Sequence, residues 1–322
     1  MDNVTFANEE LFTEAIQKSR QSATPAADAD QFFFPGFRQT FIQTSGAVIN
    51  TLVGGSGTPL LLLHGHPQTH VAWHKVAASL AQEYTVVMTD LRGYGDSSKP
   101  EGGPNHIHYS KREMGQDQIE VMKKLGFERF HAVGHDRGGR VLHQMLLDYP
   151  DAVDHAAVLD IAPTSLMYAQ TNRIFAEKYF WWFFQIQPEP LPENMINATL
   201  EFYLKDHLST QNKTPGAVAP EAFAEYLRCY QNPACIHAVC EDYRAAATID
   251  ATIENEFQGW KMQTPLLALW GAQGTLGQIF DVLGMWRERA TQVRGNTLPC
   301  GHLIPEEDPE DFLFELNRFL HV

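Results

Sequence analysis

The stretch of this chain best suited to chemistry is a glycine-rich corner that presents one acidic side chain. Positions 134 to 138 read Gly-His-Asp-Arg-Gly, after the apolar run 130–133 and before residues 141–147, which repeat apolar residues at helical spacing. A strand that turns this sharply into a helix needs small neighbours, here Gly134 and Gly138. The pattern is that of a nucleophile elbow, and the side chain it presents is Asp136.

An aspartate at this corner favours a chemistry that a serine could not perform directly. At neutral pH Asp136 is already charged and can displace a leaving group without a base. Carboxylate attack suits a saturated carbon that bears a halide or an epoxide oxygen, and it leaves an ester between substrate and enzyme. Water must then cleave that ester, so a base is still required in a second step. The alternative is that Asp136 is only a helix N-cap.

The rest of the chain alternates apolar strands with helical segments, which is typical of a mostly parallel sheet with right-handed crossovers. Ser45-Gly46 predicts a hairpin between two strands. Helices are expected at 111–125 and 309–320. Strands are expected at 39–44, 47–52, 59–63, 84–90, 130–133, 156–160, 265–271 and 293–298.

Three regions are expected. Residues 1–35 form an N-terminal extension, with a short amphipathic helix at 9–18 and a small, polar linker at 19–29. Residues 36–160 and 264–322 form the core. The block 161–263 has long helical patterns, aromatic clusters and no convincing strand, so it predicts a helical cap inserted above the sheet.

Two further residues at strand ends complete a catalytic set, because an open parallel sheet places its site there. Asp160 closes the strand after the elbow helix, and His302 follows the last strand. The order nucleophile, acid, histidine is that of an α/β-hydrolase fold. We expect His302 to activate the water that cleaves the ester, and Asp160 to fix the tautomer of His302.

The run His64-Gly65-His66-Pro67 predicts an oxyanion loop. The backbone N–H groups of His66 and Arg137 would hold the negative charge that builds up during ester hydrolysis. With His70 and His74, this stretch has four histidines and resembles a metal-ligand cluster. No second group of acidic or histidine ligands is evident, so we expect no metal.

Composition limits the class of partner. A net charge of −15 argues against nucleic acids and anionic membranes. No apolar run approaches the length of a membrane span, and the polar, acidic start lacks the features of a signal peptide, so we expect a cytoplasmic protein. The four cysteines are expected to be buried thiols; they are Cys229, Cys235, Cys240 and Cys300.

Several motifs together resemble the fluoroacetate (haloacetate) dehalogenases, from about Phe34 to the end of the chain. The resemblance rests on His64-Gly65-His66-Pro67-Gln68, Asp90-Leu91-Arg92-Gly93-Tyr94-Gly95, Gly134-His135-Asp136-Arg137-Gly138-Gly139-Arg140, Cys240-Glu241-Asp242-Tyr243-Arg244 and Gly301-His302. It implies that Asp136, Asp160 and His302 are catalytic and that Arg137 and Arg140 clamp a substrate carboxylate. One helical turn brings both arginines beside Asp136. The alternative is that Arg140 is a structural arginine paired with an acidic neighbour.

The same resemblance implies a halide site built from cap residues. The family's tryptophan and tyrosine correspond to Trp182 and Tyr243, and its histidine corresponds to Trp181, whose indole carries one donor fixed in direction. His66 is a second departure, because the family usually has phenylalanine there. Residues 179–184 are six consecutive aromatics, so core packing is the competing explanation for each tryptophan.

The sequence therefore predicts a capped α/β-hydrolase that converts a short 2-haloacid into the hydroxy acid. Its partners would be a small anionic substrate, water and halide, with no metal or organic cofactor, and a homodimer stays open. An epoxide hydrolase is the main alternative, although Arg140 would have no use for a neutral epoxide. A non-catalytic binding protein on this fold is the alternative from another class.

Overall fold

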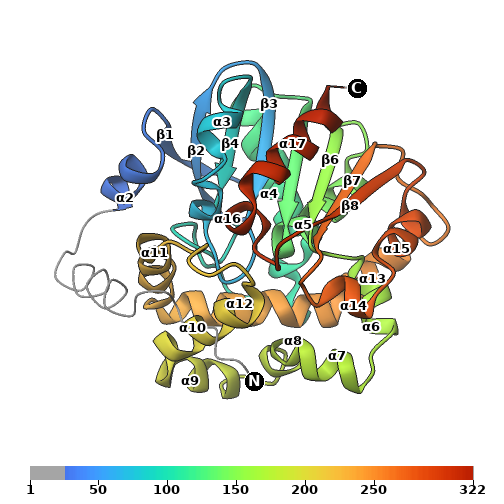
Figure 1. Cartoon of the computed structure of the whole chain (residues 1–322). Coiled ribbons are helices and arrows are strands. Elements are labelled where there is room, and N and C mark those ends of the chain that lie inside the picture. The colour runs from blue at the N-terminus through green and yellow to red at the C-terminus, as the bar shows by residue number, and fades with distance from the viewer. Residues whose placement is uncertain (1–25, 322) are drawn as a thin grey trace.

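A single eight-stranded sheet organises residues 26–321, which are the residues that the computed structural model describes (Figure 1). The strand order is β1-β2-β4-β3-β5-β6-β7-β8. β1 and β2 form the expected hairpin, β2 is antiparallel to β4, and the remaining pairs are parallel. The strands are β1 (Arg38–Gln43), β2 (Val48–Gly55), β3 (Thr58–Leu63), β4 (Tyr84–Thr89), β5 (Phe130–His135), β6 (Val153–Leu159), β7 (Leu266–Gly271) and β8 (Val293–Leu298).

The helices outside the stretch between β6 and β7 precede, connect or follow the strands of the sheet. Those expected at 111–125 and 309–320 are confirmed within one residue at each end. The set is α2 (Ala26–Phe33), η1 (His70–Trp73), α3 (Ala77–Leu80), η2 (Pro104–Tyr109), α4 (Lys111–Lys124), α5 (Asp136–Asp148), α14 (Leu276–Ile279), α15 (Val282–Arg289), α16 (Ile304–Glu307) and α17 (Pro309–Leu320).

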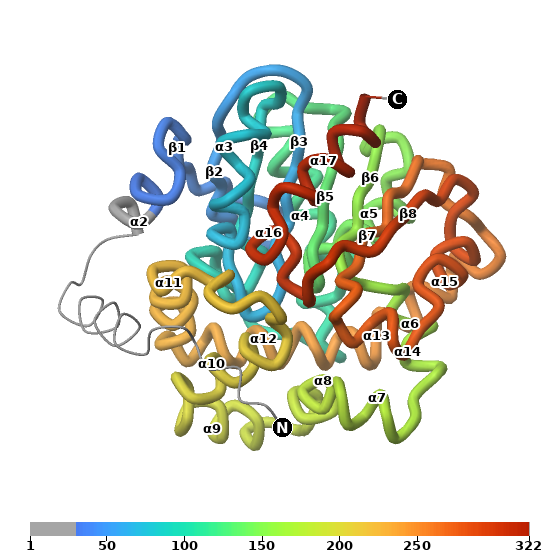
Figure 2. Tube along the Cα trace, in the orientation of Figure 1, coloured from blue at the N-terminus to red at the C-terminus, as the bar shows by residue number. Residues whose placement is uncertain are grey.

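Every residue between β6 and β7 is described, and this stretch forms helices and no strand, as expected. In Figures 1 and 2 these helices lie along one end of the sheet. Asp242 in this block binds Arg137, the second residue of α5, so the block contacts the chain where it leaves the carboxyl end of β5. The cap boundaries at 161 and 263 stay a prediction. The helices are α6 (Thr164–Ala169), α7 (Arg173–Lys178), α8 (Phe180–Gln185), α9 (Leu191–Ala198), α10 (Leu200–Gln211), α11 (Pro220–Tyr230), α12 (Pro233–Ala247) and α13 (Ile249–Asn255).

The linker expected at 19–29 is wrong in its last part, because α2 begins at Ala26. Tertiary contacts explain the helix: Asp30 Oδ1 lies 2.7 Å from Nε2 of His70, and Phe34, directly after α2, is buried against the ring of His70. The helix expected at 9–18 lies outside the described residues. None of the described helices combines the length and the apolar character needed to cross a bilayer. All four cysteines are buried thiols.

The elbow between β5 and α5 is pressed against the end of β3. Asp136 has a φ of 44°, a left-handed conformation that few residues other than glycine adopt. A methyl group on Gly138 would lie 2.3 Å from the carbonyl oxygen of Leu63 and 2.4 Å from that of His64. Only glycine lets the helix start this close to the strand that leads into the oxyanion loop.

We predict that Gly138→Ala destabilises the fold, because the added methyl meets backbone atoms that cannot move aside. Overpacking costs about 1–3 kcal/mol, measurable as a lower free energy of unfolding in urea. Gly115→Ala in α4 is the matched control: its methyl group would meet the side chain of Met145, and alanine favours a helix. Equal stability of the two variants would contradict the close approach.

Candidate active site

Asp136 is the first residue of α5, and its side chain is buried. Its Oδ1 accepts the backbone N–H of His66 at 3.0 Å, from the loop after β3. The N-cap residue of α5 is His135, and Asp136 makes none of the contacts of a cap. The explanation of Asp136 as a simple helix cap is therefore wrong.

The structure brings His302 and Asp160 together beside Asp136. Asp160 directly follows β6, and its Oδ2 lies 2.5 Å from Nδ1 of His302 while its Oδ1 accepts the N–H of Gly271 at 3.0 Å. The other ring nitrogen of His302, Nε2, lies 3.9 Å from Oδ2 of Asp136. Because Asp160 accepts the Nδ1 proton, neutral His302 carries its lone pair on Nε2. That lone pair is on the side of Asp136.

Neighbouring charges and hydrogen bonds shift the pKa values of Asp136 and His302 in opposite directions. Burial acts to raise the pKa of Asp136, but His302, Arg140 and Arg137 outweigh burial and lower this pKa below its ordinary value. Burial acts to lower the pKa of His302, but the hydrogen bond and the charge of Asp160 outweigh it and raise this pKa. Asp136 is therefore ionised at neutral pH.

Arg137 is held by Asp242, a residue of α12 that the sequence did not single out for this role. Its Nε and Nη2 donate to the Asp242 carboxylate at 2.7 and 2.8 Å, and Nη2 also donates to the Asp242 carbonyl oxygen at 2.9 Å. Asp242 in turn accepts the hydroxyl of Tyr94 at 2.7 Å and an ammonium hydrogen of Lys111. Nη1 of Arg137 is buried and has no hydrogen-bond partner.

Arg140, one turn along α5, is held by neutral groups. Its Nη1 donates to the carbonyl oxygen of Ala162 at 3.1 Å and to Oγ1 of Thr164 at 2.9 Å. Among the described residues, no carboxylate lies within ion-pair distance of its guanidinium group, so the expected alternative of a structural ion pair is wrong. Its Nε is buried without a partner. Each arginine therefore keeps one buried nitrogen without a hydrogen-bond partner, and both lie close enough to Asp136 to lower its pKa, so an anion could bind here.

The three aromatic residues expected at the halide site fall into two groups. Tyr243 lies with its ring 4.2 Å from Cζ of Arg137, and Trp182 lies with its ring 4.5 Å from Cζ of Arg140. Trp181 contacts His207 of α10 instead, with ring centroids 4.7 Å apart. All three are buried, so packing and ligand binding remain compatible for each.

The histidines near the oxyanion loop each have a partner of their own. His64 Nε2 accepts the N–H of Leu91 at 3.1 Å, and His66 Nδ1 lies 2.8 Å from the hydroxyl of Tyr230. Burial lowers the pKa of His66 to about 3, so its imidazole is neutral. Within residues 26–321, no three histidine, cysteine or acidic side chains are gathered as metal ligands.

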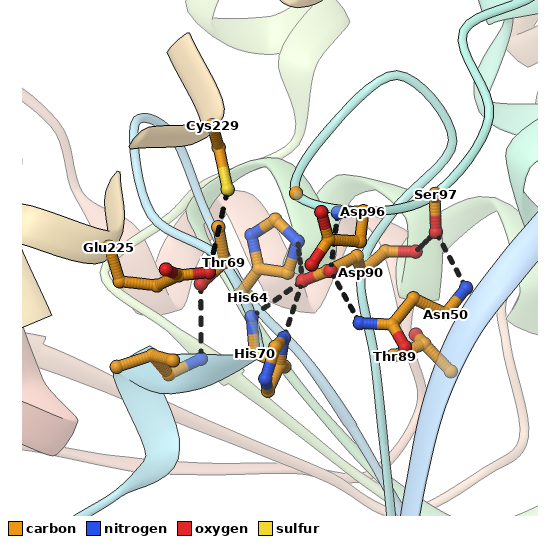
Figure 3. A network of polar contacts seen from close by, with 12 residues as sticks. Asn50, His64, Thr69, His70, Thr89, Asp90, Asp96, Ser97, Glu225 and Cys229 are labelled. Carbon is orange, nitrogen blue, oxygen red and sulfur yellow. Dashed lines mark hydrogen bonds and ion pairs between the residues drawn. The ribbon is translucent and has the colours of Figure 1, made fainter. Parts of the chain in front are cut away.

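Asp90 contacts His70, which follows the loop after β3 (Figure 3). Its Oδ1 accepts the backbone N–H of His70 at 2.9 Å and lies 2.8 Å from Nδ1 of the same residue. Since Asp30 lies at Nε2, the imidazole of His70 sits between two carboxylates. Burial acts to lower the pKa of His70, but the two carboxylates outweigh it and raise this pKa well above its ordinary value.

Comparisons with known proteins agree with this geometry. The α/β hydrolase fold family model matches residues 58–309. A fluoroacetate dehalogenase from Burkholderia sp is 44% identical over 288 residues, which are 89% of this chain and 95% of that protein. This chain belongs to the haloacetate dehalogenase family of α/β-hydrolases.

Two further relatives of the dehalogenase-family chain show how widely its fold is shared. A soluble epoxide hydrolase from Corynebacterium sp. (strain C12) is 33% identical over 83% of this chain and 91% of that protein. The crystal structure of ALR0039, an α/β-hydrolase from Nostoc sp PCC 7120, superposes with a TM-score of 0.88 at 55% identity. It covers 89% of this chain and 99% of that chain.

Sequence reasoning missed three residues of this dehalogenase-family site and its supports. Asp242 orients Arg137; it belongs to the motif at 240–244 that carries the resemblance, but it was given no role there. His207 contacts Trp181 and the ring of His66, each at 4.7 Å between centroids, and no local pattern marks it. Asp30 lies in the stretch taken for an appendage, where its charge had no visible partner.

We predict that Asp30→Asn lowers the stability of this dehalogenase-family protein, and most strongly at mildly acidic pH. The raised pKa of His70 means that its stabilising charge is fully present below about pH 6.5 and is lost as the pH rises through the raised folded-state pKa. A hydrogen bond to a charged group contributes about 1.5–3 kcal/mol. Urea unfolding across pH should show this deficit below about pH 6.5.

The control for this prediction is Asp151→Asn, since Asp151 is an exposed turn residue. It should leave the free energy of unfolding unchanged at every pH. A deficit in Asp30→Asn that grows as the solution becomes alkaline would contradict the charged state of His70.

Proposed function

We propose that this hydrolase removes halide from a short 2-haloacid, such as chloroacetate or fluoroacetate, and releases the hydroxy acid. One observation carries the proposal: Arg137 Nη1 and Arg140 Nε are buried donors without partners, on two residues whose charges lower the pKa of Asp136. A substrate carboxylate supplies the acceptors that these donors lack. The similarity to a fluoroacetate dehalogenase supports the same substrate class.

In the first step Asp136 attacks the α-carbon of the bound acid. Oδ1 already accepts the N–H of His66, so Oδ2 is the oxygen left to form the new bond. The C–O bond forms as the carbon–halogen bond breaks, and the halide leaves with the bonding electron pair. The arginines reduce the repulsion between two anions and hold the α-carbon for in-line attack.

In the second step water hydrolyses the ester. His302 Nε2 takes a proton from the water, whose oxygen attacks Cγ of Asp136, and negative charge develops on Oδ1. The N–H groups of His66 and Arg137 stabilise that charge. The Cγ–Oδ2 bond then breaks, and the product oxygen takes the proton from His302. Asp136 returns to its carboxylate form by releasing the second proton of the water to solvent. Because only neutral His302 can accept a proton, hydrolysis should accelerate as the pH rises through the raised pKa of His302.

The departing halide requires donors on the side of the helical block. Trp182 and Tyr243 pack on the two arginine side chains, which supports them as an indole N–H and a hydroxyl donor near the substrate. Trp181 is the third proposed donor. Its contact with His207 makes it the member of the set most open to a role in packing.

The alternative of an epoxide hydrolase has a named relative but explains less of the site. Asp136, Asp160 and His302 suit both reactions. A neutral epoxide leaves the two arginine donors unsatisfied, and buried unsatisfied donors weaken binding. A non-catalytic binding protein leaves the hydrolytic set without a role. Halide release measured across fluoro-, chloro- and bromoacetate, with one epoxide alongside, separates the three.

We predict that His302→Asn stops the reaction at the ester. Asparagine cannot take the proton from water, whereas attack by Asp136 needs no base. After treatment with chloroacetate, mass spectrometry should find one carboxymethyl group per protein, bound to Asp136 as an ester, and one equivalent of released chloride. Asp136→Asn is the control and should gain no mass. Unmodified protein in the His302 variant, under conditions in which the natural enzyme turns over, would refute the two-step scheme.

We also predict that Arg140→Leu weakens the use of haloacids selectively. Losing a hydrogen bond to a charged group costs about 1.5–3 kcal/mol, which is roughly a 10- to 150-fold loss in kcat/KM. A haloacetamide has the same reacting carbon and no carboxylate, so any residual turnover of it should be unchanged in this variant. Equal losses on the two substrates would point to a disturbed fold rather than a missing clamp.

A further inference from the structure

The loop that carries His302 is fixed through three consecutive backbone N–H groups. Those of Gly301 and Leu303 donate to the two oxygens of the Glu307 carboxylate, at 2.9 and 2.8 Å. The N–H of His302 itself donates to the carbonyl oxygen of Gln211 at 3.1 Å. One acidic side chain therefore holds the backbone on both sides of the histidine.

The same carboxylate binds the end of a helix in the block above the sheet. Glu307 Oε2 also accepts the N–H groups of Lys213 and Thr214, at 2.8 and 3.0 Å, directly after α10. This helix carries His207, whose ring contacts Trp181 and His66. Glu307 thus joins the His302 loop to the helix that borders the site from above.

Atoms are tightly packed around Gly301, where the His302 loop meets the end of α10. A methyl group on Gly301 would lie 2.4 Å from the carbonyl oxygen of Gln211 and 2.8 Å from Oε1 of Glu307. Glu307 is itself buried. Four N–H donors converge on it, so an amide in its place would set N–H groups against N–H groups.

His302 needs this support more than Asp136 and Asp160 do. Asp136 and Asp160 directly follow β5 and β6, so the sheet fixes their positions. His302 stands four residues beyond β8, in the loop before α16, and must still keep its Nε2 3.9 Å from Asp136 Oδ2. A displacement of about 1 Å in a catalytic group can cost roughly 100-fold in rate.

We propose that Glu307 is a positioning residue that fixes His302 against α10, and that it governs hydrolysis of the Asp136 ester rather than its formation. The inference rests on the proposed function, because it assigns Glu307 to one of the two steps. Ester formation draws on Asp136, Arg137 and Arg140, which all belong to α5 and have no hydrogen bond or ion pair with Glu307. Hydrolysis requires the imidazole that Glu307 holds in place.

The test measures the two steps separately in Glu307→Gln. Rapid mixing with chloroacetate, followed by quenching and mass analysis, gives the rate at which the ester appears and the rate at which it decays. We expect ester formation within about two-fold of the natural enzyme and hydrolysis slower by roughly 10- to 100-fold. The ester should then accumulate at steady state. Glu310→Gln, an exposed glutamate of α17, is the matched control and should behave as the natural enzyme does.

Two results would overturn the proposal. Unchanged hydrolysis in Glu307→Gln would remove Glu307 from the positioning of His302. Equal losses in formation and hydrolysis would make Glu307 a general structural residue. Glu307→Asp keeps the charge but is one methylene too short to reach all four donors, so its hydrolysis rate should fall between those of the natural enzyme and the glutamine variant.

A second measurement needs neither a variant nor a substrate. In the natural enzyme, the amide hydrogens of Gly301, Leu303, Lys213 and Thr214 should exchange with deuterated water with one common protection factor. They become exposed together when the hydrogen bonds to Glu307 break. Separate protection factors for the loop and the end of α10 would contradict the joint. If the enzyme converts no haloacid, the proposed function fails, while this exchange experiment still decides the role of Glu307.

Discussion

A carboxylate that stays ionised inside the protein is the constraint on which the rest of this structure depends. Burial alone would push Asp136 toward its neutral form, which is a poor nucleophile. Three cationic groups and one backbone N–H offset that tendency, yet within residues 26–321 the one ion pair of Asp136 is the 3.9 Å approach of His302 Nε2 to Oδ2. The charge is therefore stabilised without being covered, and Oδ2 remains open to a substrate.

The cations that stabilise Asp136 are themselves buried and must be held in turn. Asp242 holds Arg137, and Lys111 contacts Asp242, so the network runs from α5 into α12 and back to α4. Buried ion pairs add little net stability, because desolvation offsets the attraction. Orientation explains this network better than stability does. It fixes the guanidinium of Arg137 and still leaves Nη1 free, whereas a second carboxylate would have consumed that donor.

Local signals made the sharp turn at Asp136 and most strands predictable, because glycines at a turn and apolar runs depend on neighbours in the chain. Asp242 and Arg137 are 105 positions apart, and no local pattern pairs two charges over that distance. The N-terminal linker was mispredicted for the same reason. Its composition is small and polar, but Asp30 reaches a histidine 40 positions away. Glu307 lies close to His302 in the sequence, but its role could not be predicted because it depends on where α10 ends.

The division between sheet and helical block separates the residues that both candidate reactions would share from those that would select the substrate. Proteins named as a fluoroacetate dehalogenase and as a soluble epoxide hydrolase both align with most of this chain. Asp136 and Asp160 follow sheet strands, so their geometry survives changes in the residues above them. In the proposed function, the groups that distinguish an acid from an epoxide lie where α5 meets α12. They are Arg137, next to Asp136, and Asp242, which binds all but one of the nitrogens of Arg137. Specificity would then depend on how many donors of the buried arginines still lack a partner when the substrate binds. That number is set by the pairing of Arg137 with Asp242 and not by Asp136.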